Sequence, residues 1–87
     1  MDRSGPRSPG RVGMEVAASV RALMGRKRVT QADLARATGI SQSVLSRVLA
    51  DQRDLSVDEL HLIAQYLGVD AGRIIDNAMQ HTILADG

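Results

Sequence analysis

The feature that most constrains the fold of this chain is a stretch with room for two short helices and only a tight turn between them. It spans the 20 residues Thr30–Leu49, TQADLARATGISQSVLSRVL. Ala35 has the small side chain that a close crossing of two helices requires. Gly39 follows four residues later, and a glycine adopts a positive φ without steric cost, so it ends the first helix and reverses the chain. The stretch therefore predicts two helices that meet at a steep corner.

The second helix of this corner is expected from about Ser41, a favourable N-cap, to Ala50, with an apolar and a polar side. The apolar residues recur at spacings of three and four, as Leu45, Val48 and Leu49, and Ile40 fills the corner. The polar side consists of Gln42, Ser43, Ser46 and Arg47. In a major groove, Gln binds the edge of adenine, Arg the edge of guanine, and Ser either base. These four side chains are candidates for reading DNA bases. A helical corner with a solvated polar side is the alternative interpretation.

The order of residues in this stretch resembles the Cro and repressor family of lambdoid phages, also called the XRE-like helix-turn-helix family. The resemblance rests on TQADLA, GISQ and LSRVLADQR, continued by SVDELHLIAQYLGVD, and it extends over roughly residues 14–80. It implies an all-α fold, a compact bundle of about five short helices with a lambda-repressor-like DNA-binding domain. It also implies a transcriptional regulator, most like a short phage Cro-type protein, whose partner is double-stranded operator DNA.

The resemblance implies separate roles for the two helices of the corner. In that family, a glutamine at the start of the first helix contacts a phosphate, and early residues of the second helix contact bases. These roles fall on Gln31 for the phosphate and on Gln42, Ser43 and Arg47 for the bases. One departure is Asp51-Gln52-Arg53, where relatives often have an Asn-Gly turn, so the conformation of this loop is not implied.

Further candidates for the DNA backbone lie close to the corner in the sequence. They are Thr30, Ser41, Arg53 and the basic cluster Arg26, Lys27 and Arg28. The cluster equally fits compensation of a helix dipole at the end of the first helix. Arg53 equally fits an ion pair with Asp51 or Asp54.

Charge is unevenly distributed along the chain. Residues 1–29 carry seven basic and two acidic groups, a net charge of +5, whereas residues 50–87 carry two basic and seven acidic groups, a net charge of −5. Such a polarity orients the N-terminal side of a protein toward a polyanion such as DNA.

Residues 1–13 contain three Gly, both Pro and two Ser, a composition that predicts a disordered basic arm ahead of a domain at 14–84. Arg3, Arg7 and Arg11 are candidates for contacts with the DNA backbone or the minor groove. A solubilising tail is the alternative interpretation.

Periodicity and capping signals predict three more helices. The first runs from about Met14 to Gly25 or Lys27, with the apolar stripe Val16, Val20, Leu23 and Met24. Another starts at the capping box Ser56–Glu59 and stops at Gly68, with the inward residues Val57, Leu60, Ile63, Ala64 and Leu67. The last is capped by Asp70 and reaches about Ile83, with Ile74 and Ala78 in the core and with Ile75, Met79 and Ile83 as possible dimer contacts.

Composition limits the classes of protein that fit. At 87 residues and 44% hydrophobic content, the chain is expected to form one small domain. Tyr66 is the only aromatic residue, so aliphatic side chains must build the core, which favours packed helices over a β-sandwich. The absence of cysteine excludes disulfides and thiolate metal sites. The expected location is the cytoplasm or nucleoid of a bacterium, with either a phage or a bacterial gene as its source.

Catalysis is not predicted, nor is a cofactor or a metal. His61 and His81 fall in different helices without an adjacent carboxylate at ligand spacing, and no glycine-rich phosphate loop is present. The competing hypothesis is an antitoxin-like or protein-docking helical module that binds DNA weakly. The expected assembly is a monomer or weak homodimer, with the dimer favoured on DNA.

Overall fold

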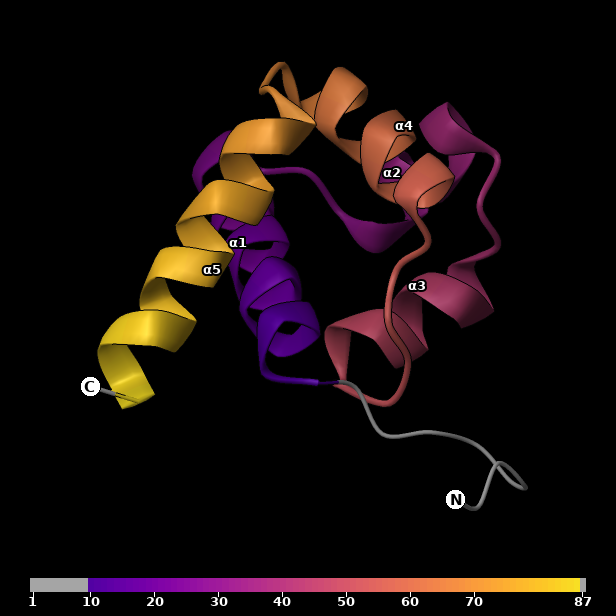
Figure 1. The fold of residues 1–87 in the computed structure, drawn as a ribbon. Coiled ribbons are helices and arrows are strands. Elements are labelled where there is room, and N and C mark those ends of the chain that lie inside the picture. The colour runs from indigo at the N-terminus through magenta and orange to yellow at the C-terminus, as the bar shows by residue number, and fades with distance from the viewer. Residues whose placement is uncertain (1–9, 87) are drawn as a thin grey trace.

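The computed structural model describes residues 10–86, and the side chains of residues 10–81, as five α-helices joined by short turns (Figure 1). The helices are α1 Arg11–Lys27, α2 Gln31–Thr38, α3 Gln42–Leu49, α4 Val57–Leu67 and α5 Ala71–Asp86. No strand occurs among these residues, so the all-α prediction is confirmed.

Side-chain caps fix where α2, α3 and α4 begin. The Thr30 hydroxyl accepts a hydrogen bond from the Asp33 N–H at 3.0 Å, and the Asp33 carboxylate accepts one from the Thr30 N–H at 3.1 Å. The same reciprocal pair joins Ser56 and Glu59, at 3.1 and 2.9 Å. Ser41 caps α3 alone, by accepting from the Val44 N–H at 3.1 Å. Each cap satisfies a backbone donor that a helix start leaves free, and the predicted capping box at Ser56–Glu59 and the predicted N-cap at Ser41 are confirmed.

Residues in the left-handed region end four of the helices. Gly39 ends α2 at φ 78° and Gly68 ends α4 at φ 74°, as predicted. Among the described non-glycine residues, Arg28 after α1 and Asp51 after α3 also adopt positive φ, at 55° and 59°. Asp tolerates this conformation better than most residues. Asp51 therefore provides the turn for which relatives often use Asn-Gly.

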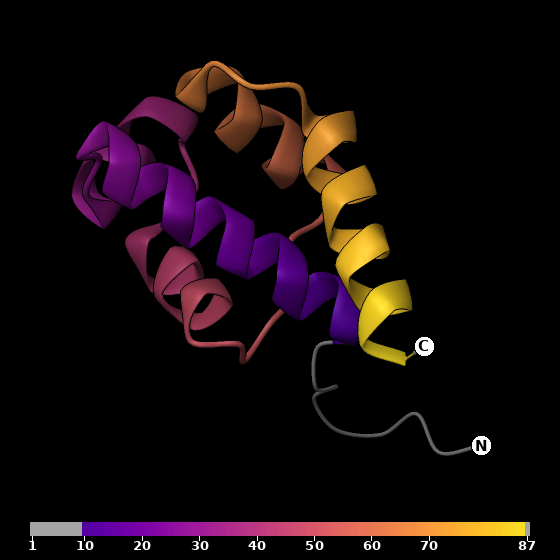
Figure 2. The same cartoon turned by 90° about the vertical axis from the view of Figure 1, so that its left-hand side faces the viewer.

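All five helices contribute to one core, and α1 lies at its centre. Figures 1 and 2 show α5 alongside α1, with α2 and α4 together at the opposite end and α3 against the remaining side of α1. Leu34 of α2 and Ile63 of α4 have no exposed surface. The predicted apolar stripes of α1 and α3 are buried, except that Leu49 is only partly so. The core residues predicted on α5, Ile74 and Ala78, are also buried.

The first helix begins three residues earlier than predicted. Gly10 is its N-cap and its carbonyl accepts from the Met14 N–H at 3.0 Å, so residues 11–13 are helical and do not belong to an arm. The cause is tertiary, because this first turn packs closely on the loop before α4. A Cβ atom at Gly13 would lie 1.8 Å from Oδ1 of Asp54. Residues 1–9, with Arg3 and Arg7, lie outside the described residues.

The prediction that Val57 points inward is wrong, since 79% of its surface is exposed. The spacing of Val57 fits the apolar stripe, because it lies three residues before Leu60 and seven, about two turns, before Ala64. Val57 is, however, the first residue of α4. Because side chains tilt toward the start of a helix, its side chain extends past the packed part of the stripe.

Ile63, which is fully buried, and Val57, which is largely exposed, give a matched test of the core from the same helix. Ile63→Ala should lower the free energy of unfolding by about 2–5 kcal/mol, because it opens a cavity at a fully buried site. Val57→Ala should change it by less than about 0.5 kcal/mol. Urea denaturation followed by circular dichroism measures both changes. Similar losses for the two variants would contradict the arrangement of α4.

Candidate nucleic-acid interface

The four predicted base-reading residues lie on one exposed side of α3. Gln42, Ser43, Ser46 and Arg47 are all exposed, and their spacing of one and four residues places them together on the helix surface. Leu45 and Val48, on the other side, are 99% buried, with 1% of their surface exposed. The core therefore holds α3 by its apolar side and leaves this polar side accessible.

The start of α2 combines capping groups with a predicted phosphate ligand. Gln31 is the first residue of α2 and is partly exposed. The Thr30 and Ser41 oxygens accept hydrogen bonds as caps, yet each hydroxyl retains a proton that it can donate to a phosphate. The backbone N–H and hydroxyl of Thr30 lower the pKa of Asp33, which keeps its carboxylate charged.

Arg36 on α2 and Arg21 on α1 are cations close to the helix pair that the sequence analysis did not single out. Arg36 Nη2 donates to Asp33 Oδ1 at 2.7 Å, and 75% of its side chain is exposed. Asp33 and Arg36 are three residues apart, a spacing typical of ion pairs on a helix, so the sequence alone could have indicated this contact. Arg21 Nη1 donates to the carbonyl oxygen of Leu49 at 2.6 Å, across 28 residues of sequence. No local pattern reveals a contact at that separation.

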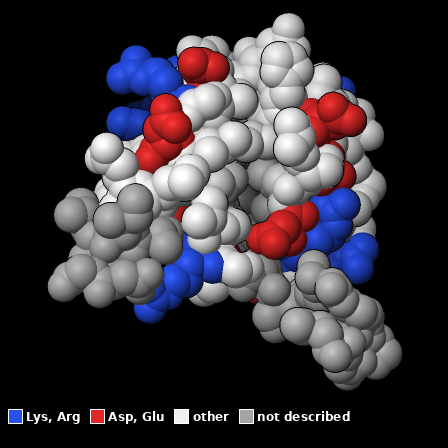
Figure 3. Space-filling view, in the orientation of Figure 1, with Lys and Arg blue, Asp and Glu red and all other residues white. Residues whose placement is uncertain are grey.

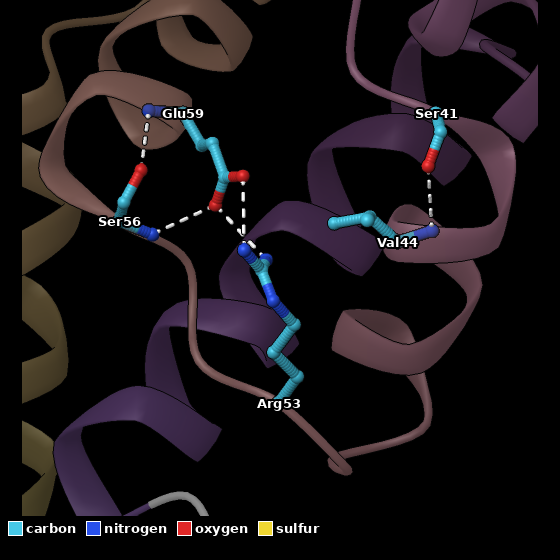
Figure 4. A network of polar contacts seen from close by, with 5 residues as sticks. All are labelled: Ser41, Val44, Arg53, Ser56 and Glu59. Carbon is cyan, nitrogen blue, oxygen red and sulfur yellow. Dashed lines mark hydrogen bonds and ion pairs between the residues drawn. The ribbon is translucent and has the colours of Figure 1, made fainter.

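Arg53 binds Glu59, and the predicted partners Asp51 and Asp54 are wrong. Its Nη1 and Nη2 atoms donate to the two carboxylate oxygens of Glu59 at 3.0 and 3.1 Å (Figure 4). The capping box with Ser56 holds Glu59 in place, so the carboxylate presents both oxygens to the planar guanidinium. Arg53 thus joins the loop after α3 to the start of α4.

This network shifts the pKa of both partners. The Arg53 guanidinium lowers the pKa of Glu59 below its ordinary value of 4.5, and the Ser56 N–H adds to the shift while burial opposes it. The Glu59 carboxylate in turn raises the pKa of Arg53. The ion pair therefore persists at neutral pH.

The three residues of the basic cluster at the end of α1 are exposed, but they do not share one surface. Arg26 lines a shallow groove between α1 and α5 together with Asp70 and Arg73, so the structure does not group it with the polar side of α3. Lys27 and Arg28 are exposed at the turn that leads into α2. Of the cluster, these two residues are next in sequence to the helix pair.

The remaining polar groups form no further centre in the described part of the chain. No set of three His, Cys, Asp or Glu side chains there is placed to hold a metal ion. His61 is exposed, and His81 Nδ1 lies 3.4 Å from Glu15 Oε1. None of the described helices combines the length and apolarity needed to span a membrane.

The fold and the exposed side of α3 define a helix-turn-helix protein, the class in which α2 supports α3 against DNA. The helix-turn-helix family model matches residues 20–74. The chain therefore belongs to the XRE-like helix-turn-helix family, whose members are DNA-binding transcription regulators. Comparison with curated proteins found no significant match.

Solved structures of similar fold include three regulators. The clp gene regulator ClgR from Corynebacterium glutamicum has a TM-score of 0.76 and 22% identity, over 92% of this chain and 84% of that chain. A mutant of the restriction-modification controller protein C.Esp1396I has a TM-score of 0.72 and 19% identity, over 88% and 96%. The hypothetical transcription factor NHTF from Neisseria has a TM-score of 0.66 and 21% identity, over 84% and 86%.

The Arg53–Glu59 pair predicts how stability depends on pH. Because the pKa of Glu59 is lowered by folding, its contribution is present above the ordinary value of 4.5 and is lost as pH falls through the folded-state pKa. The midpoint of thermal unfolding should therefore fall more steeply in acid for the wild type than for Glu59→Gln. Asp58→Asn, which also removes an acidic group from the first turn of α4, should keep the steep fall. Parallel pH curves for the wild type and Glu59→Gln would contradict the pair.

Proposed function

We propose that this protein is a sequence-specific transcriptional regulator of the Cro or repressor type, which inserts α3 into the major groove of double-stranded DNA. The observation that carries the proposal is the two-sided burial of α3. Its apolar side is sealed in the core, and Gln42, Ser43, Ser46 and Arg47 are exposed together on the other side. Gln, Ser and Arg side chains match base edges in the major groove.

The proposed backbone contacts surround this helix. Gln31, with the N–H groups at the start of α2, is assigned to a phosphate. The hydroxyls of Thr30 and Ser41 are assigned to neighbouring phosphates, together with Lys27 and Arg28. Because the terminal nitrogens of Arg53 are bound to Glu59, Arg53 is assigned to support of the loop instead.

The N-terminal residues add a sequence-independent contribution in this proposal. Arg3 and Arg7 precede the first helix in the sequence and are assigned to a phosphate or a minor groove. Arg11 begins α1, so its reach is set by the helix. Membership of a DNA-binding helix-turn-helix family supports a bacterial cytoplasm or nucleoid as the proposed place of action.

The competing function, docking of a protein partner with only weak DNA binding, makes a different prediction for salt. Binding that neutralises several phosphates weakens steeply as salt rises, whereas an apolar docking surface responds little. Fluorescence anisotropy with random duplex DNA at two salt concentrations separates the two functions. An affinity that does not depend on salt would favour docking.

Arg47→Ala tests base reading directly. The variant should lose about 1–3 kcal/mol of binding free energy on a duplex that the wild type selects from a random library, and should accept more bases at one position. Arg73→Ala, which removes an exposed arginine from α5, is the control and should retain the preference of the wild type. Equal preference in Arg47→Ala and the wild type would remove Arg47 from the base-reading set.

A second surface is proposed for assembly. Val12, Val57 and Ile75 line a small apolar groove between α1, α4 and α5, and Met79, one turn beyond Ile75, is 47% exposed. Figure 3 shows that the middle of this face is mostly uncharged. Ile83, the third predicted dimer contact, lies outside the described side chains. So small an apolar area supports a weak dimer that strengthens on DNA.

Met79→Asp should shift the monomer–dimer equilibrium toward the monomer, because it places a charge in the proposed contact. Gln80→Asp adds the same charge on the side of α5 that faces the other groove and should have little effect. Sedimentation velocity over a wide range of protein concentrations measures both. A tight dimer in both variants would refute the location and the weakness of the contact.

A further inference from the structure

The carbonyl groups at the C-terminal end of α3 all have donors, and one donor comes from another helix. A helix normally leaves its last four carbonyls without a partner inside the helix. Here the N–H groups that follow α3 supply three donors at 2.9–3.1 Å, and Arg21 Nη1 of α1 supplies the fourth to Leu49 at 2.6 Å. The three backbone pairs are Ala50 to Ser46, Gln52 to Arg47 and Asp51 to Val48.

Asp51 provides a second observation at the same place. Its backbone is left-handed at φ 59°, and its buried Oδ1 atom has no hydrogen-bond partner among the described residues. Arg21 Nη1 lies 3.7 Å from that oxygen, within ion-pair distance. The guanidinium therefore lies between the negative end of the α3 dipole and a carboxylate. Since 41% of the Arg21 side chain is exposed, solvent weakens the ion pair, and the bond to Leu49 is the more directional contact.

The loop that follows α3 meets α1 a second time at Asp54, three residues after Asp51. Asp54 packs so closely on Gly13 that a Cβ atom there would lie 1.8 Å from its Oδ1. Figure 1 shows the loop between α3 and α4 passing the start of α1. Leu45 and Val48 hold the apolar side of α3 in the core, and these attachments at its C-terminal end restrict its angle relative to α1.

We propose that Arg21 is a positioning residue for α3, the helix that reads bases in the proposed function. It holds the C-terminal end of α3 on α1, and this contact sets the orientation in which Arg47 meets DNA. This inference rests on the proposed function, because it assumes that α3 reads bases. Arg21 acts through Leu49 and Asp51 and is not assigned a base of its own.

The test compares Arg21→Met, which keeps most of the aliphatic stem, with Arg21→Lys, which restores a cation. For each folded variant, anisotropy gives the ratio of affinities for the duplex selected by the wild type and for random duplex, at one salt concentration. Arg21→Met should lower this ratio about tenfold, the scale of one hydrogen bond to a charged group. Arg21→Lys should recover part of it. Arg73→Met, which removes one exposed arginine from α5, should leave the ratio unchanged.

An Arg21→Met variant with the ratio of the wild type would overturn the proposal, whatever its thermal midpoint, because a purely structural role changes stability and not selectivity. If the wild type itself selects no sequence, the proposed function fails separately. Amide hydrogen exchange of the free protein then tests whether Arg21 holds the C-terminal end of α3 on α1. Faster exchange at Asp51 and Gln52 in Arg21→Met, relative to the α4 amides, supports it, and unchanged exchange refutes it.

Discussion

The burial of Leu45 and Val48 is the interaction on which the rest of the site depends. An isolated helix of eight residues is not stable in water, because nucleation costs more than so few hydrogen bonds return. With 1% of their surfaces exposed, these two side chains supply the tertiary contacts that keep α3 helical. They also set its rotation about its own axis. Because the apolar side of α3 packs into the core, the polar side faces solvent.

The two ends of α3 are fixed by different kinds of contact. At its start, the Ser41 hydroxyl and the left-handed turn at Gly39 are local, so both follow from a few neighbouring residues. At its end, Arg21 reaches Leu49 from α1, and Arg53 carries the loop onto Glu59 of α4. These are contacts between elements, and they place α3 relative to the rest of the molecule.

This difference explains what the sequence predicted and what it did not. Caps, glycine turns and apolar stripes act over three or four residues, so the helix order, both capping boxes and the polar side of α3 were predictable. The early start of α1 depends on Gly13 packing on Asp54, 41 residues later, and the partner of Arg53 depends on where α4 begins. Val57 was misassigned because its spacing fits the apolar stripe, although it is the first residue of α4 and lies beyond the packed part of that helix. The assignments to bases and phosphates remain predictions.

The proposed DNA surface and the apolar groove are formed by different elements and differ in charge. The groove of Val12, Val57 and Ile75 has one charged residue in its lining, Asp54. Such an apolar surface does not attract phosphates, whereas the exposed cations Arg36 and Arg47 on α2 and α3 do. This difference supports the proposal that the molecule approaches DNA with α2 and α3. In the proposed complex, the apolar groove would remain available for a second protein chain while α3 occupies the major groove.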